Sequence, residues 1–231
     1  MKNVSKITYK DKSLAFVILI GGKSTRFGSD KGIFEFLGKP LISYQIETIV
    51  KFNKEIFLVA HSQKQVQTYK IKIETDNIKE FFLDDIDLIS NENLRTPMIG
   101  LYTAFKELRK LDYEKVFILS CDAPLIKYDL IELLIEQSEG FDCCIPRWNN
   151  GFLEPLFAIY PVKKAFDRVE ECLKSEQYKL TKILDNNWKI NYISQSSIKA
   201  IDKKFISFIN INGPIDIEKL MEGYQRKSNY E

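Results

Sequence analysis

A glycine-rich segment near the N-terminus combines backbone freedom with fixed positive charge. Residues 19–31 read LIGGKSTRFGSDK. Glycine has no Cβ, so a glycine-rich backbone can pass close to phosphate groups with its N–H groups pointing inward. A guanidinium in the segment can bind phosphate oxygens in pairs, and an ammonium acts as a point charge. The segment therefore predicts a nucleoside triphosphate site rather than a flexible turn, and its residues are Gly21, Gly22, Arg26, Gly28 and Lys31.

Two common phosphate-binding signatures do not describe this segment. The pattern GxxxxGK[ST] needs a Ser or Thr directly after its lysine, and neither follows Lys31. The dinucleotide pattern GxGxxG does not occur in the segment either. The phosphate site predicted here therefore belongs to another class of nucleotide-binding protein.

A second group with chemical potential stands after the apolar run at residues 115–120. The chain reads Ser120-Cys121-Asp122-Ala123-Pro124. A carboxylate at a strand end can hold a Mg²⁺ ion that bridges phosphate oxygens. With Lys31 nearby, Asp122 would complete a site for phosphoryl transfer, which needs mainly positioning and charge. The alternative is that Asp122 only caps the helix that follows.

Short apolar runs alternate with segments of helical periodicity, and this alternation must position both groups. Strands that are apolar throughout indicate a mainly parallel sheet with helices on both faces, a three-layer α/β/α sandwich with a Rossmann-like sheet. Strands are predicted at residues 14–20, 55–60, 81–83, 115–120, 142–146, 153–160, 190–193 and 205–209. Helices are predicted at residues 40–52, 63–69, 98–110, 129–137, 162–173 and 214–221.

The predicted domain organisation is simple. Residues 14–222 form one domain between an N-terminal extension at 1–13 and a C-terminal tail at 223–231. Ligands of such sheets bind outside the carboxyl ends of the strands. The glycines after the first strand and Asp122 after the fourth both fall at that edge.

The ordered motif GG-x-S-x-R-F-G-x-D-K, followed by GKPLI at Gly38–Ile42, resembles the MobA-like nucleotidyltransferases. The resemblance extends from about Leu14 to Leu220. It implies a fold of the nucleotide-diphospho-sugar transferase type. It also implies transfer of GMP from GTP to molybdopterin, with formation of molybdopterin guanine dinucleotide and release of pyrophosphate.

The same resemblance assigns roles on the nucleotide side. It implies that Arg26, Lys31 and Asp122 are catalytic and that Asp122 is the metal ligand, with Mg²⁺ as the cofactor. Pro97 and Gly100 match a GPLAG-like segment of the family whose backbone could read the base. The residues expected at the nucleotide are Leu19, Ile20, Gly21, Gly22, Arg26, Gly28, Lys31, Asp85, Pro97, Gly100 and Asp122.

Two assignments near the nucleotide stay open. The family has one Asp after the third strand, and we select Asp85, with Asp84, Asp87 or a merely solvated acidic turn as alternatives. Guanylyltransferases of the family often carry an Asn after the second strand, where this chain has Val59. His61 or Ser62 could substitute for that Asn, although a surface role for His61 is the simpler interpretation.

The acceptor side is expected in the C-terminal half. The segments around Pro146, Glu154–Ala158 and Ser207–Asp216 resemble those of the family. Arg147 could meet the terminal phosphate of the acceptor, and Asn210 and Asn212 could hydrogen-bond a pterin ring. An ordinary turn and helix cap at Asn212-Gly213-Pro214 is the alternative.

Composition excludes several classes of protein. The 231 residues carry a net charge of only +2, which gives no basic field for nucleic acid. No apolar run approaches the length of a membrane span, so a cytoplasmic protein is expected. The four cysteines show no CxxC spacing and His61 is the only histidine, which predicts reduced, buried thiols rather than a zinc site.

The predicted function is therefore GMP transfer, with GTP and molybdopterin as substrates. Molybdoenzymes or cofactor-insertion proteins are the expected downstream partners, and a monomer or weak homo-oligomer is the expected state. Three alternatives remain: a cytidylyltransferase, a sugar-phosphate nucleotidyltransferase of the same fold, and a non-catalytic nucleotide-binding protein. The sequence Ile20-Gly21-Gly22 argues against the first, which typically has AAG there. The charged residues Arg26, Lys31 and Asp122 argue against the last.

Overall fold

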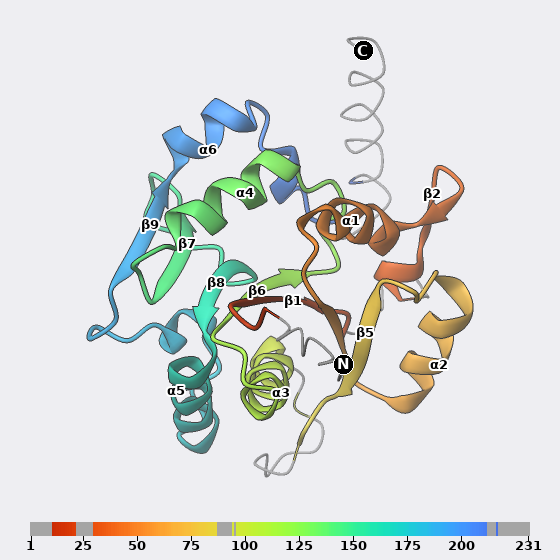
Figure 1. Ribbon diagram of the computed structural model, residues 1–231, viewed down its shortest axis with the longest axis horizontal. Helices are drawn as coiled ribbons and strands as arrows, with labels where there is room; N and C mark the ends of the chain where they lie inside the picture. Colours follow the sequence, from red (N-terminus) through yellow and green to blue (C-terminus); the bar gives the residue numbers. More distant parts are fainter. Residues whose placement is uncertain (1–10, 22–29, 87–93, 95, 212–215, 217–231) are drawn as a thin grey trace, which may run out of the picture.

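The computed structural model describes residues 11–21, 30–86, 94, 96–211 and 216. Within these residues a seven-stranded sheet forms the centre of the molecule, in the order β5-β4-β1-β6-β8-β7-β9 (Figure 1). All neighbouring strands are parallel except β8, which runs antiparallel between β6 and β7. The strands are β1 (Leu14–Leu19), β4 (Ile56–Ala60), β5 (Ile78–Leu83), β6 (Lys115–Ser120), β7 (Cys143–Arg147), β8 (Phe157–Pro161) and β9 (Ile190–Ser194).

Strand β1 lies in the middle of the parallel part and is buried along its whole length. Successive side chains of a strand point to opposite faces, so an entirely apolar strand needs a helical layer on each side. Phe16 and Ile18 join the apolar cluster on one face, whereas Val17 joins the cluster on the other. The apolar run recognised in the sequence therefore becomes the shared centre of two cores.

Helices cover both faces of the sheet (Figure 1). One core contains residues of α1 (Leu41–Ile49), α2 (Gln63–Lys72), α4 (Tyr128–Gln137) and α6 (Gln195–Ile201). The opposite core contains residues of α3 (Pro97–Lys110) and α5 (Val162–Lys174). This three-layer arrangement confirms the predicted fold class.

A short ribbon leads from the first strand toward α1. It consists of β2 (Glu35–Phe36) and β3 (Lys39–Pro40), which pair antiparallel. Between them Gly38 adopts a positive φ of 83°, a conformation that glycine tolerates best. The ribbon follows the short 3₁₀ helix η1 (Lys31–Ile33), which carries the lysine of the glycine-rich motif.

The predicted start of α3 is confirmed in detail. Thr96 is the N-cap, and its side chain accepts a hydrogen bond from the Met98 N–H at 3.3 Å. Pro97 occupies the first turn, where a missing N–H costs nothing because that donor has no partner in a helix. The cap fixes where α3 begins at the carboxyl edge of the sheet.

The predicted strand at residues 205–209 is wrong. The chain forms the 3₁₀ helix η4 (Ile206–Phe208) there, preceded by Phe205 in a left-handed conformation with φ 53°. Ser207 explains the difference, because its N–H donates to Asp202 Oδ2 at 2.8 Å and its hydroxyl accepts from the Lys127 N–H at 3.1 Å. These two partners, Asp202 close in the chain and Lys127 far from it, replace the hydrogen bonds that a sheet would supply.

Two further elements differ from the prediction, and one lies almost wholly outside the described residues. The strand predicted at 153–160 begins only at Phe157, because the Phe157 N–H closes a turn onto the Glu154 carbonyl at 3.0 Å. Helix α6 was not predicted; Ser194 caps it by accepting from the Ser197 N–H at 3.1 Å. The predicted helix at 214–221 lies outside the described residues apart from Asp216, and the predicted domain bounds stay a prediction.

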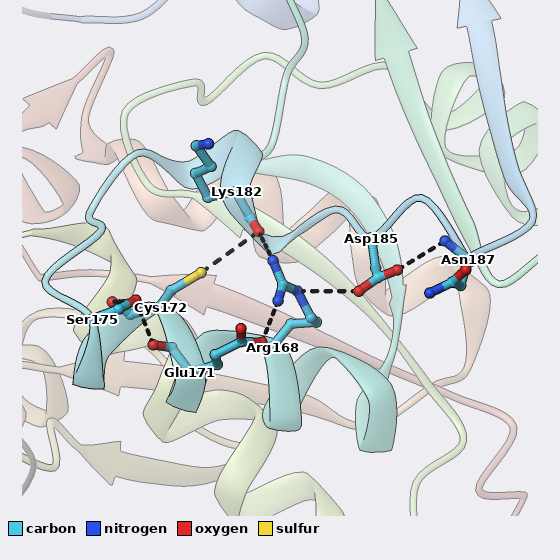
Figure 2. Close-up of polar contacts among 7 residues, drawn as sticks. All are labelled: Arg168, Glu171, Cys172, Ser175, Lys182, Asp185 and Asn187. Atoms are coloured by element: carbon cyan, nitrogen blue, oxygen red, sulfur yellow. Dashed lines mark hydrogen bonds and ion pairs between the residues drawn. The ribbon is translucent and has the colours of Figure 1, made fainter.

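Arg168 ties α5 to the segment around the 3₁₀ helix η3 (Leu180–Ile183) (Figure 2). Its Nη2 donates to the Lys182 carbonyl at 3.0 Å, and its Nε lies 3.5 Å from Asp185 Oδ2. The Cys172 thiol also reaches the Lys182 carbonyl, at 3.6 Å. The predicted state of the cysteines is confirmed, since all four are buried free thiols.

Replacement of Arg168 by Met is expected to lower the free energy of unfolding. The change keeps the apolar stem but removes charged hydrogen bonds, and such bonds typically contribute about 1.5–3 kcal/mol. Urea unfolding of the variant measures the loss. The matched control is Lys174→Met on the same helix, whose pair with Glu170 is exposed and should matter by less than about 0.5 kcal/mol. Equal losses for the two variants would contradict the role given to Arg168.

Candidate active site

A cavity of about 520 Å³ lies over the carboxyl ends of β1, β4 and β5. Its lining includes one residue from each strand end: Leu19 of β1, Val59 of β4 and Asp84 directly after β5. The start of α3 contributes Thr96, Pro97 and Gly100. This is the edge at which parallel sheets bind their ligands. We call it the strand-end cavity.

The strand-end cavity is lined by four of the eight described residues predicted to meet the nucleotide. Leu19, Gly21, Pro97 and Gly100 line it. Ile20 is buried, and its carbonyl accepts a hydrogen bond from Gln65 Nε2 at 2.7 Å. The predicted residues Gly22, Arg26 and Gly28 lie outside the described residues.

Gly100 allows α3 to approach β1 closely. A Cβ at this position would stand 3.3 Å from Leu19 Cδ2 and 3.7 Å from Asp84 Oδ1. A side chain here would therefore crowd Leu19 at the strand end, whereas its Cβ would make only ordinary contact with the Asp84 carboxylate. Gly100, which matches the family pattern, therefore lines the cavity and also allows close packing of α3 against β1.

Asp84, rather than the selected Asp85, lines the strand-end cavity. Asp85 is held against α3, where its carboxylate pairs with Lys106 and its N–H donates to Thr103 Oγ1 at 2.8 Å. The structure thus favours an alternative that the sequence left open. Asp87 lies outside the described residues.

Lys31 and Asp122 face each other beside the ends of β1 and β6. The distance from Lys31 Nζ to Asp122 Oδ2 is 3.9 Å, and the two side chains are 22% and 23% exposed. The register of the sheet places Asp122 beside the end of β1, because Leu19 of β1 pairs with Ser120 of β6. The pair offers an ammonium for phosphate oxygens next to a carboxylate for a cation.

The backbone that carries Asp122 is held from two directions. Gln45 on α1 is fully buried, and its Nε2 donates to the carbonyls of Ser120 at 2.7 Å and Ala123 at 2.6 Å. The Ile211 N–H donates to the Asp122 carbonyl at 2.8 Å. Sequence patterns gave no reason to select Gln45, whose role depends on carbonyls far along the chain.

A second cavity, of about 190 Å³, adjoins the first. Asp122, Glu154 and Asn210 line it, and Ser120 and Leu156 line both cavities. The two cavities therefore share part of their lining close to Asp122, whereas Lys31 lines neither of them. We call the second space the acceptor-side cavity.

The predicted acceptor residues separate in the structure. Asn210 lies on the acceptor-side cavity. Arg147 lines neither cavity; it is exposed at the end of β7, with its guanidinium carbon 4.8 Å from the centre of the Tyr192 ring. Asn212 lies outside the described residues.

Glu154 is a further carboxylate that the sequence did not single out. Its Oε1 accepts a hydrogen bond from Trp148 Nε1 at 2.5 Å. Burial raises the pKa of Glu154, the bond from Trp148 lowers it, and the nearby charge of Asp122 raises it. The only signal in the sequence was its position before Pro155 in a segment that resembles the family.

Asp122 is the residue of this site that could hold a divalent cation. Within the part of the chain that the structure describes, no cluster of three or more His, Cys, Asp or Glu side chains gathers in a metal-binding arrangement. Mg²⁺ is usually held by one or two carboxylates and completes its shell with water and substrate phosphates. Asp122 beside the two cavities fits that mode of binding.

Comparison with known proteins places this geometry in a class. Residues 16–190 match the family described as the MobA-like NTP transferase domain. The crystal structure of molybdopterin-guanine dinucleotide biosynthesis protein A from Archaeoglobus fulgidus superposes with a TM-score of 0.72 at 25% identity, over 92% of this chain and 99% of that one. Fold, site and family together define a nucleotidyltransferase.

The chain belongs to the MobA-like NTP transferase family. A relative from Thermococcus gammatolerans is 33% identical over 215 residues, which cover 89% of this chain and 98% of the relative. One from Thermococcus kodakarensis is 31% identical over 208 residues, covering 88% and 92%. Both carry the name "Probable molybdenum cofactor guanylyltransferase". The family predicted from the glycine-rich motif is thus confirmed.

Replacement of Glu154 by Gln is expected to change how stability depends on pH. A carboxyl whose pKa is raised by folding favours the folded state most at low pH, and this contribution is lost as the pH rises from its ordinary pKa of 4.5 through the folded value. Gln keeps the shape and an acceptor for Trp148 but does not titrate. The melting temperatures of the wild type and the variant are measured over a series of pH values. As the pH rises, the melting temperature of the variant should increase relative to that of the wild type. Parallel curves would contradict the environment described for Glu154.

Proposed function

We propose that this protein is a molybdenum cofactor guanylyltransferase that transfers GMP from GTP to molybdopterin. The observation that carries the proposal is the Lys31–Asp122 pair, 3.9 Å apart, with Asp122 on the acceptor-side cavity, which shares Ser120 and Leu156 with the strand-end cavity. A nucleotidyl transfer needs such a junction, because a nucleotide and an acceptor must reach one phosphorus atom from two sides. The names of the relatives support GTP and molybdopterin as the two substrates.

In the proposed reaction a terminal phosphate oxygen of molybdopterin attacks the α-phosphorus of GTP. The bond from that phosphorus to the oxygen shared with the β-phosphate breaks, pyrophosphate leaves, and the dinucleotide form of the cofactor results. A phosphate monoester has a second pKa near 6, so the attacking oxygen needs no protein base at neutral pH. The product is proposed to pass to molybdoenzymes or to the proteins that insert the cofactor.

Lys31 and Asp122 have complementary tasks in this proposal. The Lys31 ammonium binds the phosphate oxygens on which negative charge develops. Asp122 is the residue that would hold Mg²⁺, which when bound neutralises phosphate charge. Arg26 is proposed to bind the triphosphate from the glycine-rich segment, together with Gly22 and Gly28.

The base and the acceptor have separate contacts. We propose that His61 and the start of α3 meet the nucleoside, since both line the strand-end cavity. Ser62 is already engaged as the N-cap of α2, accepting from the Gln65 N–H at 3.2 Å. Asn210 and Glu154 are proposed to bind the pterin, which offers several hydrogen-bond donors and acceptors at its ring edge.

We propose that the protein is located in the cytoplasm. None of the helices among the described residues is long and apolar enough to cross a membrane. The four buried thiols are those of a protein folded in a reducing compartment. A monomer or weak homo-oligomer stays a prediction.

A thermal-shift panel of GTP, CTP, ATP and UTP, each with Mg²⁺, tests the base. A ligand at about 100 times its dissociation constant stabilises the folded protein by roughly 2.7 kcal/mol, which raises the melting temperature by several degrees. We expect that shift for GTP alone. A shift for CTP would retain the chemistry and change the product, whereas no shift for any of the four would contradict the nucleotide site.

Alanine variants of the central pair test the chemistry. Lys31→Ala and Asp122→Ala should each lower kcat by about 10²–10³-fold, the usual loss when one transition-state contact is removed. Lys39→Ala is the matched control, because Lys39 of β3 pairs with Glu47 of α1 and lines neither cavity. Pyrophosphate release with molybdopterin as acceptor measures all three. Retention of activity within a few-fold in either test variant would contradict the role of that residue.

A further inference from the structure

Two side chains of α2 reach the segment that carries Lys31, although α2 contributes no residue to the lining of either cavity. Gln65 and Tyr69 stand four residues apart and so share one face of the helix. Gln65 is 5% exposed and Tyr69 is fully buried. A buried glutamine and a buried tyrosine hydroxyl persist only where their hydrogen bonds are satisfied.

Gln65 joins three segments through one side-chain amide. Its Nε2 donates to the Ile20 carbonyl at 2.7 Å and also to Asp30 Oδ2. Its Oε1 accepts from the His61 N–H at 2.9 Å. Ile20 and Asp30 stand near the two ends of the glycine-rich segment at residues 19–31, so Gln65 fixes both ends of the segment against the end of β4.

Tyr69 completes the hold on Asp30. Its hydroxyl donates to Asp30 Oδ1 at 2.6 Å, and the Gly32 N–H donates to the same oxygen at 3.1 Å. Burial raises the pKa of Tyr69, which keeps the hydroxyl protonated as a donor. A Cβ at Gly32 would come within 2.2 Å of that hydroxyl, so only glycine lets the two segments meet.

We propose that Gln65 and Tyr69 are positioning residues that act through Asp30 to place the Lys31 ammonium for phosphoryl transfer. The Asp30 carboxylate receives three donors, two from α2 and one from η1, and Lys31 follows it directly in the chain. This holds the start of η1 in one orientation, and Lys31 Nζ then lies 3.9 Å from Asp122. The inference rests on the catalytic role proposed for Lys31.

A double-mutant cycle between Tyr69→Phe and Lys31→Ala tests this proposal. Tyr69→Phe removes one donor to Asp30 and keeps the ring. If Tyr69 acts through Lys31, the change should lower kcat by about tenfold or more in the wild-type background, because small misplacements of a reacting group are costly. In the Lys31→Ala background the same change should have almost no further effect. A merely structural role would lower kcat equally in both backgrounds, which would overturn the proposal.

Tyr44→Phe provides the matched control. Tyr44 is also a buried tyrosine near η1, but its hydroxyl donates to the Phe36 carbonyl at 2.7 Å and not to Asp30. We expect a similar loss of stability and a change in kcat of less than about threefold. A Tyr44→Phe effect on kcat as large as that of Tyr69→Phe would overturn the specific role of the Asp30 contact.

The same cycle is measured in the dissociation constant of GTP with Mg²⁺ by calorimetry. Tyr69→Phe should weaken binding in the wild-type background and leave it unchanged without the Lys31 side chain. If the protein binds GTP but transfers nothing to molybdopterin, the proposed function is contradicted. The cycle measured in the dissociation constant would still show whether Tyr69 acts through Lys31. Additive effects on the dissociation constant would overturn the positioning while leaving transfer by the wild type intact. Absence of binding for every nucleotide would overturn both.

Discussion

Parallel pairing between β1 and β6 is the constraint on which the rest of the structure depends. Leu19 stands opposite Ser120, so the chain leaves both strands at the same level. One strand leads into the glycine-rich segment and the other into Asp122. A change of register would separate the two groups, and burial on both faces of the sheet fixes that register. Both cavities lie at this edge because the strand ends form their floor.

Two buried glutamines stabilise the irregular backbone that follows these strands. Gln45 from α1 holds the carbonyls on either side of Asp122, and Gln65 from α2 holds Ile20 and Asp30 near the two ends of the glycine-rich segment. Backbone groups outside a sheet need such partners when they are shielded from water. The helices of this layer therefore do more than cover the sheet, since they supply the hydrogen bonds that give the active-site backbone one conformation.

The sequence was most informative where one local pattern determined the outcome. The apolar runs at β1 and β6 and the cap of α3 could be predicted because strands buried on two faces and Thr-Pro helix starts have strong local signatures. Which of Asp84 and Asp85 lines the strand-end cavity could not be predicted from a local pattern. It depends on the contacts of Asp85 with Lys106 and Thr103, which lie further along the chain. Residues 205–209 read as a strand, but buried Asp202 and the Lys127 N–H supply partners that only the tertiary structure provides. Gln65 and Tyr69 escaped notice because α2 is polar overall and resembles a surface helix.

The central claim is that the Lys31–Asp122 pair joins a nucleotide to a phosphorylated pterin. The most direct measurement follows GTP labelled at the α-phosphate, with Mg²⁺ and molybdopterin, in the wild type and in Asp122→Asn. The account predicts that the wild type transfers the label into molybdopterin guanine dinucleotide with one pyrophosphate released per label, and that the variant binds GTP but transfers almost none. Equal transfer by Asp122→Asn, or pyrophosphate release without label in the pterin product, would contradict it.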